Sequence, residues 1–316
     1  MSKSDSQIVR LDRMPVVPAW AVARVPVSSD TEAAFLAGAA LNTLDNLVRL
    51  QPDWAGVWRQ RLALKCAVSA VRLTGRSEDE AALRDVWILR GSGDDLGPAG
   101  SIFAAYKRLA ARSVPIDMKV LRELTDLFAI RWSDELATIP AIIDDVKQAG
   151  LMAPFAAAAI VAEVLAVRPD AETLAWWLAD WVLAQRLHWD RPIPLLMAHR
   201  ASPAFRLEAG RGRMRPAEPG FERAVCLALA QASADACRLA SELARRADRL
   251  VAVAPKLRAK GAGEAIRILL DEDAVSGALR TARLSRWASR RLFERLIEFD
   301  AVRELSGRST FRIYGL

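Results

Sequence analysis

Apolar residues recur at helical spacing along most of the chain. After the helix start at Ser28-Ser29-Asp30 they fall at Phe35, Leu36, Ala39, Ala40, Leu44 and Leu47. Recurrence at intervals of three and four residues predicts an amphipathic helix. The same spacing, interrupted by capping residues, Pro and Gly, predicts further helices over about residues 53–75, 78–89, 98–111, 117–129, 133–149, 154–167, 170–187 and 218–250. The pattern therefore predicts a mainly α fold with a multi-helix body.

Breaks in this pattern divide the chain into three parts. Residues 1–30 are punctuated by prolines and predict an extended N-terminal arm. The helical body is expected over 31–255. Within it, residues 200–216 are rich in arginine and lack periodicity, which predicts a mobile basic loop or linker. Proline and glycines near residue 260 then separate the body from a C-terminal unit over 262–316.

The C-terminal unit carries the most informative order of elements. Its pattern predicts short helices over 264–270 and 275–282 and a strong third helix over 286–299. Alternating segments at 302–305 and 310–314 flank a glycine turn and predict a β-hairpin. Three helices followed by a hairpin predict a small winged helix-turn-helix, in which the third helix enters the DNA major groove and the hairpin forms the wing.

The net charge of +7 is confined to the end of the chain. From Arg238 onward there are 17 Lys and Arg residues against 10 Asp and Glu, whereas the first 237 residues hold 28 of each. A localised positive excess is typical of a module that binds a polyanion. The alternative is an arginine-rich composition without functional meaning.

The third helix and the wing supply the predicted DNA contacts. The helix is expected to bury a stripe at Ala288, Leu292, Leu296 and Phe299, which leaves Arg291 near the boundary. The acidic run 271–273 would have to face away from the DNA. Arginine on such a helix reads guanine edges or holds phosphate. The predicted nucleic-acid-binding residues are Arg283, Ser285, Arg286, Ser289, Arg290, Arg295, Arg308 at the wing tip, and Arg312.

The sequence contains no pattern typical of an enzyme site, so we expect no catalytic residues, no cofactor and no bound metal. His188 and His199 are the two histidines, and neither has a second ligand at the spacing that helical zinc sites use. The glycine-rich segment 91–100 lacks the Lys-Ser/Thr of a phosphate loop. Trp176, Trp177 and Trp181 predict a buried stripe, with an aromatic effector pocket as the alternative.

Cysteine usage and hydropathy indicate the compartment. Three scattered cysteines are too few for a disulfide framework, which fits a reducing cytoplasm. The N-terminus has no apolar signal core. Residues 151–167 are apolar but alanine-rich, so a buried helix is favoured over a membrane span. We expect a cytoplasmic protein without a membrane partner.

Several motifs resemble a known family. AFLAGAALNTLDNLV, EDEAALRDVWILRGSGDDLGPAG, LAWWLADWVLAQRL, RRADRLVAVAPKLRAKGAG and AVRELSGRSTFRIYGL look like domain-of-unknown-function family 1403, a group from rhizobia and related alphaproteobacteria that is often plasmid-borne. The C-terminal unit is similar to the helix-turn-helix found after Fic-type domains, although the Fic motif itself is absent. It departs from that pattern at VSGALRTA, which lacks a Leu-Ala-x-x-Leu-Gly run, and at Trp287. The resemblance implies an intracellular bacterial protein and no established activity.

We therefore expect a DNA-binding protein that regulates transcription at a plasmid or accessory locus. The body would mediate homodimerisation. Two alternatives stay open. In one, the winged helix docks a protein partner without any catalysis; in the other, the helical body senses an effector in a pocket.

Overall fold

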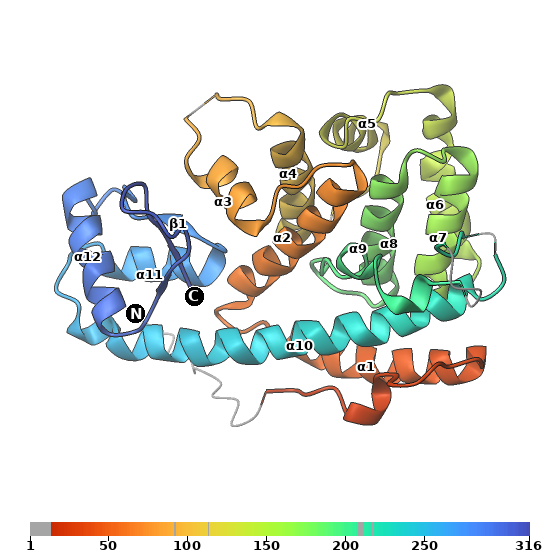
Figure 1. The fold of residues 1–316 in the computed structure, drawn as a ribbon, viewed down its shortest axis with the longest axis horizontal. Coiled ribbons are helices and arrows are strands. Elements are labelled where there is room, and N and C mark those ends of the chain that lie inside the picture. The colour runs from red at the N-terminus through yellow and green to blue at the C-terminus, as the bar shows by residue number, and fades with distance from the viewer. Residues whose placement is uncertain (1–13, 92, 113, 208–211, 217) are drawn as a thin grey trace, which may run out of the picture.

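The structure is a computed structural model that describes residues 14–91, 93–112, 114–207, 212–216 and 218–316. Within these ranges the chain forms twelve α-helices and one small sheet (Figure 1), so the predicted mainly helical class is confirmed. The helices are α1 Asp30–Leu50, α2 Ala55–Leu73, α3 Glu80–Ile88, α4 Gly97–Ala111, α5 Met118–Leu127, α6 Ile139–Gln148, α7 Ala153–Val167, α8 Glu172–Arg186, α9 Leu196–His199, α10 Phe221–Val253, α11 Ala262–Asp271 and α12 Arg286–Glu298.

Local capping explains where several helices begin. The Ser29 hydroxyl accepts a hydrogen bond from the Glu32 amide at 3.2 Å, and α1 starts at Asp30. The side chains of Asp79 and Asp117 accept equivalent bonds in front of α3 and α5. Each bond satisfies an amide that the first helical turn leaves free.

Helix α10 is the longest element and organises the body. Its 33 residues span about 50 Å at 1.5 Å per residue. Helix α1 lies along it on one side, and α2, α7 and α9 contact it from the other (Figure 1). Many buried positions of α10 are alanine, which allows the neighbouring helices to approach closely.

The three tryptophans of α8 lie in the core, which confirms the predicted buried stripe. Trp177 donates its indole N–H to the carbonyl of Ala105 at 2.9 Å, and Trp181 donates to the carbonyl of Val114 at the same distance. These bonds satisfy the one polar group of each ring. Helix α7 is also largely buried, as predicted. No helix in the described ranges has both the length and the apolar character needed to cross a membrane.

We call residues 262–316 the C-terminal module. It contains α11, α12 and the strands β1 (Val275–Ser276), β2 (Arg303–Glu304) and β3 (Ile313–Gly315). Strand β3 pairs antiparallel with both others, giving the order β1-β3-β2. The predicted hairpin is therefore confirmed, with β3 ending at Gly315.

The predicted helix over 275–282 is wrong. Val275 pairs with Tyr314 in the sheet, and the chain then follows turns up to α12. The Gly277 amide donates to the carbonyl of Arg312 at 2.8 Å, which extends the contact with β3. Because Val275 gains a buried place in the sheet, long-range pairing outweighs the weak helical pattern of this segment.

The described parts of the arm and of the basic loop pack on the body. Phe205 is fully buried, and its ring meets that of Trp176 with 5.5 Å between centroids. The backbones of Arg206 and Arg213 pair as an isolated antiparallel β-bridge. In the arm, Val17 is buried. Residues 1–13 and 208–211 of these two predicted segments lie outside the described residues.

Candidate nucleic-acid interface

Helix α12 lies at the outer edge of the C-terminal module, on the side away from the body (Figure 1). The Ser285 side chain caps it by accepting the Ala288 amide at 3.3 Å. Leu292, Phe293 and Leu296 are buried against the module. Phe293 stacks on Tyr314 of β3, with ring centroids 4.6 Å apart and planes 6° apart. One face of α12 is thus fixed to the sheet, and the opposite face is turned to solvent.

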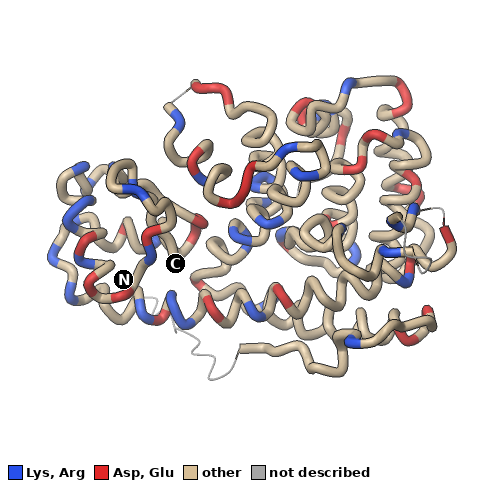
Figure 2. Tube along the Cα trace, in the orientation of Figure 1, with Lys and Arg blue, Asp and Glu red and all other residues tan. Residues whose placement is uncertain are grey.

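The solvent face of α12 carries arginines with few competing acids. Arg286, Arg290 and Arg291 are exposed. Arg290 meets Glu294 at 3.5 Å, and both side chains are more than half exposed. An ion pair of this kind contributes little free energy and is easily exchanged for another partner. Figure 2 shows the basic positions that gather along this edge.

The other predicted arginines of the module differ in their surroundings. Arg283 is exposed in the turn before α12, and Arg312 is exposed before β3. Arg295 lies 3.4 Å from Glu298 and over the ring of Phe299. Each of these three side chains still reaches solvent.

Ser289 is a correction to the predicted set. It is fully buried, and its hydroxyl donates to the carbonyl of Gly277 at 3.2 Å. A serine in the middle of a basic helix was expected to face solvent. The partner that holds it is a turn twelve residues earlier, so Ser289 cannot contact a ligand on the outer face.

Arg308 lies in the loop between β2 and β3, as expected, but its side chain turns toward the body. Its Nη2 donates to Asp85 of α3 at 2.5 Å. The loop between β2 and β3 is thereby attached to the body through this ion pair. Nη2 of Arg308 is thus occupied by Asp85 and is not free for a ligand at α12.

Two exposed residues of α12 were absent from the predicted set. Trp287 is 75% exposed, and Arg291 lies on the same outward face. Since Ser289 belongs to the buried face together with Leu292 and Leu296, the outward face is centred near residues 287 and 291. Because Ser289 is polar, the sequence pattern places it on the solvent face of α12, and this shifts the predicted face away from Trp287 and Arg291.

The acidic run 271–273 contacts the body through what we call the anchor cluster, which consists of Arg61, Arg84, Lys107, Glu272 and Asp273. The Asp273 carboxylate accepts from Arg61 and, at 2.6 Å, from Nε of Arg84. Lys107 of α4 donates to Glu272 at 2.8 Å. Two of the three acids, Glu272 and Asp273, are therefore paired with the body, and Asp271 is exposed.

Burial and charge act in opposite directions at Asp273. The carboxyl is 3% exposed, and this burial by itself would raise its pKa. Arg61 and Arg84 outweigh burial, so the pKa of Asp273 lies below its ordinary value. Asp273 is therefore charged at neutral pH, and its charge is matched inside the molecule by Arg61 and Arg84.

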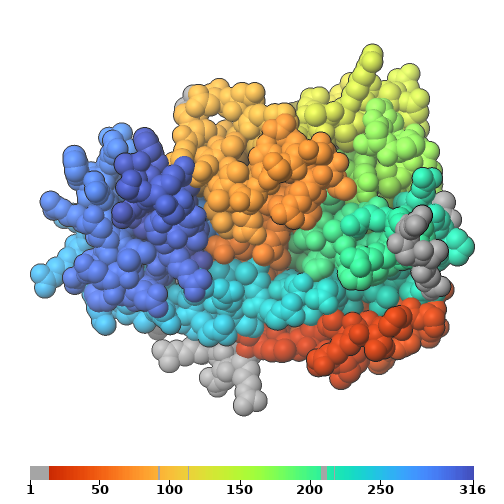
Figure 3. All heavy atoms as spheres, viewed as in Figure 1, coloured from red at the N-terminus to blue at the C-terminus, as the bar shows by residue number. Residues whose placement is uncertain are grey.

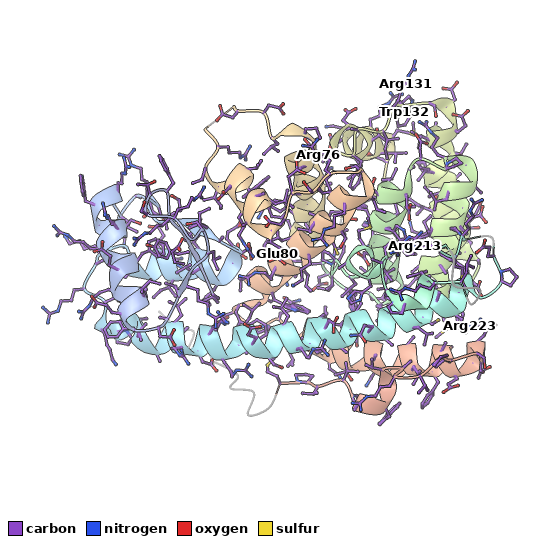
Figure 4. All side chains as sticks on the ribbon, in the orientation of Figure 1. Arg76, Glu80, Arg131, Trp132, Arg213 and Arg223 are labelled. Atoms are coloured by element: carbon purple, nitrogen blue, oxygen red, sulfur yellow. The ribbon has the colours of Figure 1, made fainter. Side chains whose placement is uncertain are left out.

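The body contains a cavity of about 910 Å³ between α2, α3, α9 and α10. Its wall carries both signs of charge: Lys65 lies 3.4 Å from Glu80 (labelled in Figure 4), and His199 lies 3.7 Å from Asp235. The three tryptophans of α8 do not line it. Among the described residues, no group of three or more His, Cys, Asp or Glu side chains is placed to hold a metal ion.

Asp180 of α8 is the most perturbed carboxyl with a structural role. It is fully buried, and its two oxygens accept the amides of Leu195 and Leu196 at 2.9 and 3.0 Å. Burial raises the pKa of Asp180 to about 7, although these bonds lower it. Asp180 caps the short helix α9 and does not line the cavity described above.

Comparison with known proteins identifies a family but no characterised relative. A search of the curated proteins finds no match to this sequence. The model of the family described as "Protein of unknown function (DUF1403)" matches residues 5–316. Since this match covers nearly the whole chain, the protein belongs to the DUF1403 family, as its sequence motifs led us to expect.

Proposed function

We propose that this protein binds DNA through the outer face of α12. The observation that carries the proposal is the free cationic surface of this helix. Arg286, Arg290 and Arg291 are exposed there, on a helix whose other face is fixed by Phe293 and Tyr314. A preformed helix with outward arginines can enter a major groove without a further ordering cost.

The order of elements in the module also supports the proposal. The module has a helix, a strand, a second helix and a hairpin, with the sheet order β1-β3-β2, and it shares this part of its order with the predicted winged helix but has no middle helix. Turns replace that helix between residues 277 and 284. From residue 277 onward the chain holds nine arginines against four acidic residues, an excess of five positive charges.

The test is DNA binding by the full chain, measured by fluorescence anisotropy with a labelled duplex between 50 and 200 mM salt. We expect affinity that falls steeply as salt rises. The variant with Arg286, Arg290 and Arg291 changed to alanine should lose at least about a hundredfold in affinity, since each good arginine contact contributes about 1–3 kcal/mol.

A matched control removes three exposed cations that lie outside the C-terminal module, Arg112, Lys119 and Arg131. Figure 4 labels Arg131 at the end of the view opposite to α12. This control variant should bind like the wild type. Equal losses in both variants, or a wild type that binds no duplex, would contradict the proposal. Chromatin capture of the tagged protein would then test the predicted regulatory role.

Docking of a protein partner is the second candidate, and exposed aromatic residues favour it. Trp287 is 75% exposed and Phe311 is 72% exposed. Exposed aromatic side chains favour docking because tryptophan and other aromatic residues often supply much of the binding energy of protein interfaces. Under this alternative, Trp287→Ala abolishes capture of the partner, and the triple arginine variant does not change retention on DNA.

A further inference from the structure

A second basic segment lies beside α12. It follows α10 and covers residues 256–260, with the sequence Lys-Leu-Arg-Ala-Lys. We call Lys256, Arg258 and Lys260 the basic rail. All three are exposed, whereas Leu257 and Ala259 between them are half-buried against the core. Lys256 ends the short 3-10 helix Ala254–Lys256, residues 257–259 have no regular structure, and Lys260 lies in a turn. The rail is therefore defined by the alternation of exposed and half-buried side chains, and it is not a regular strand.

Two contacts fix the course of this segment. At its start, the Lys256 ammonium lies 5.7 Å from the ring centroid of Phe299, the residue that follows α12. At its end, Gly261 touches the turn in front of α12. A Cβ on Gly261 would lie 2.8 Å from the Leu284 Cβ and 3.0 Å from the Arg283 carbonyl oxygen.

The segment therefore runs alongside α12, from its C-terminal end to its N-terminal end. Space-filling atoms show the module as a lobe at the end of α10, beside α2 and α3 (Figure 3). Helix α12 belongs to this lobe, and the rail is the segment that connects α10 to it.

The charges of the rail are available to a ligand. Among the described residues, neither Lys256, Arg258 nor Lys260 forms an ion pair. The acid that follows α12, Asp300, is paired with Arg249 of α10. Regularly spaced, flexible cations suit the phosphate backbone, which carries no base information, whereas the arginines of a helix can reach base edges.

We propose that the basic rail holds the phosphate backbone of a DNA duplex while α12 occupies the adjacent groove. This inference rests on the proposed function and adds a division of labour to it. The rail supplies affinity that does not depend on sequence and sets the position of the duplex. Helix α12 supplies whatever preference among sequences the protein has.

The experiment compares the full-length wild type with a variant in which Lys256, Arg258 and Lys260 are all changed to glutamine. Binding to several duplexes of different sequence is measured between 50 and 200 mM salt. Each phosphate contact contributes about 0.9 to the slope of log affinity against log salt. We expect the slope to become shallower by about 2 to 3 and the affinity at 50 mM salt to fall at least about tenfold, by a similar factor for every duplex.

Two further variants make the result specific. The charge-retaining change of Lys256→Arg, Arg258→Lys and Lys260→Arg should preserve both slope and affinity. The distant triple Arg112→Gln, Lys119→Gln and Arg131→Gln should do the same. Because all these side chains are exposed, thermal unfolding is expected to be unchanged and excludes misfolding as the cause of a loss.

The outcomes separate the two proposals. If the wild type binds DNA and the glutamine variant keeps the same slope, the rail is not a phosphate contact, although the function proposed for α12 stands. A loss that differs greatly between duplexes also overturns the inference, because the rail would then read sequence. If the wild type binds no duplex, the proposed function fails, and the rail proposal fails with it.

Discussion

The inner and outer faces of the C-terminal module carry charges in opposite ways. On the inner face, the Asp273 carboxylate is 3% exposed and is matched by two arginines of the body. On the outer face, arginines of α12 and the basic rail are exposed and have weak partners or none among the described residues. Both faces therefore carry arginines, but only those of the outer face are left in solvent, where a polyanion could reach them.

The largest expected effect comes from breaking the inner face. Asp273→Asn removes the negative charge but keeps the shape, which leaves Arg61 and Arg84 buried without their common partner. We expect a loss of about 3–5 kcal/mol in the free energy of unfolding, measured by urea denaturation at pH 7. A loss below about 1 kcal/mol would show that the buried charges find other partners.

The same variant has a pH signature. Because the pKa of Asp273 lies below its ordinary value of 3.8, its stabilising contribution is complete above that pH and disappears as pH falls through the lowered value. The difference in unfolding free energy between wild type and Asp273→Asn should thus be constant near neutrality and shrink below about pH 4. A difference that persists unchanged in acid would contradict the assigned role of the charge.

A smaller effect is expected from Gly56→Ala, at the contact of α2 with the end of α11. The added Cβ would lie 2.6 Å from the Cα of Asp271, so the backbones must move apart. We expect a loss of about 1–3 kcal/mol in thermal or urea unfolding.

Gly38→Ala in α1 is the matched control for this substitution, since nothing lies within 4 Å of its Cβ. It should stabilise the protein by up to about 1 kcal/mol, because alanine is the better helix former. Equal changes in the free energy of unfolding for the two variants would mean that α11 does not pack closely against α2 at Gly56.

The smallest effect on stability is expected at the outer face. Arg290 and Glu294 are 71% and 55% exposed, so Arg290→Ala should change the free energy of unfolding by less than about 0.5 kcal/mol. The same measurement as for Asp273→Asn checks it. A large loss here would mean that α12 is held by its arginines and is not free to bind a ligand.

Local signals predicted most helices, and distant partners account for what they missed. The apolar stripe of α12 can be predicted from fifteen neighbouring residues; in the structure Leu292 and Leu296 are buried, and Ala288 and Phe299 are half-buried. The partners of Val275 and Ser276 in strand β1 are Tyr314 and Ile313, which follow 39 and 37 residues later. Helix α9 depends on a cap from Asp180 of another helix. Such contacts depend on tertiary structure, so the local sequence pattern does not predict them.

The candidate site follows the same rule. Exposure of Arg286 and Arg290 could be predicted from the helical pattern, because the opposite stripe is strongly apolar. The burial of Ser289 depends on the Gly277 carbonyl, and the attachment of Arg308 depends on Asp85 of α3. Likewise, the position of the basic rail beside α12 depends on the contact of Gly261 with the turn at Leu284.

The long helix α10 has a consequence for any assembly of this protein. It extends through the body, and near its far end Arg249 holds Asp300, while Asp273 fixes the module to α2 and α3. Attachment at separate points leaves little freedom for α12 to swivel. If two copies dimerise through their bodies, as the sequence predicts, the distance between their two α12 helices will be fixed. If α12 also binds DNA as proposed, duplexes would engage both copies at once when their half-sites repeat at that interval.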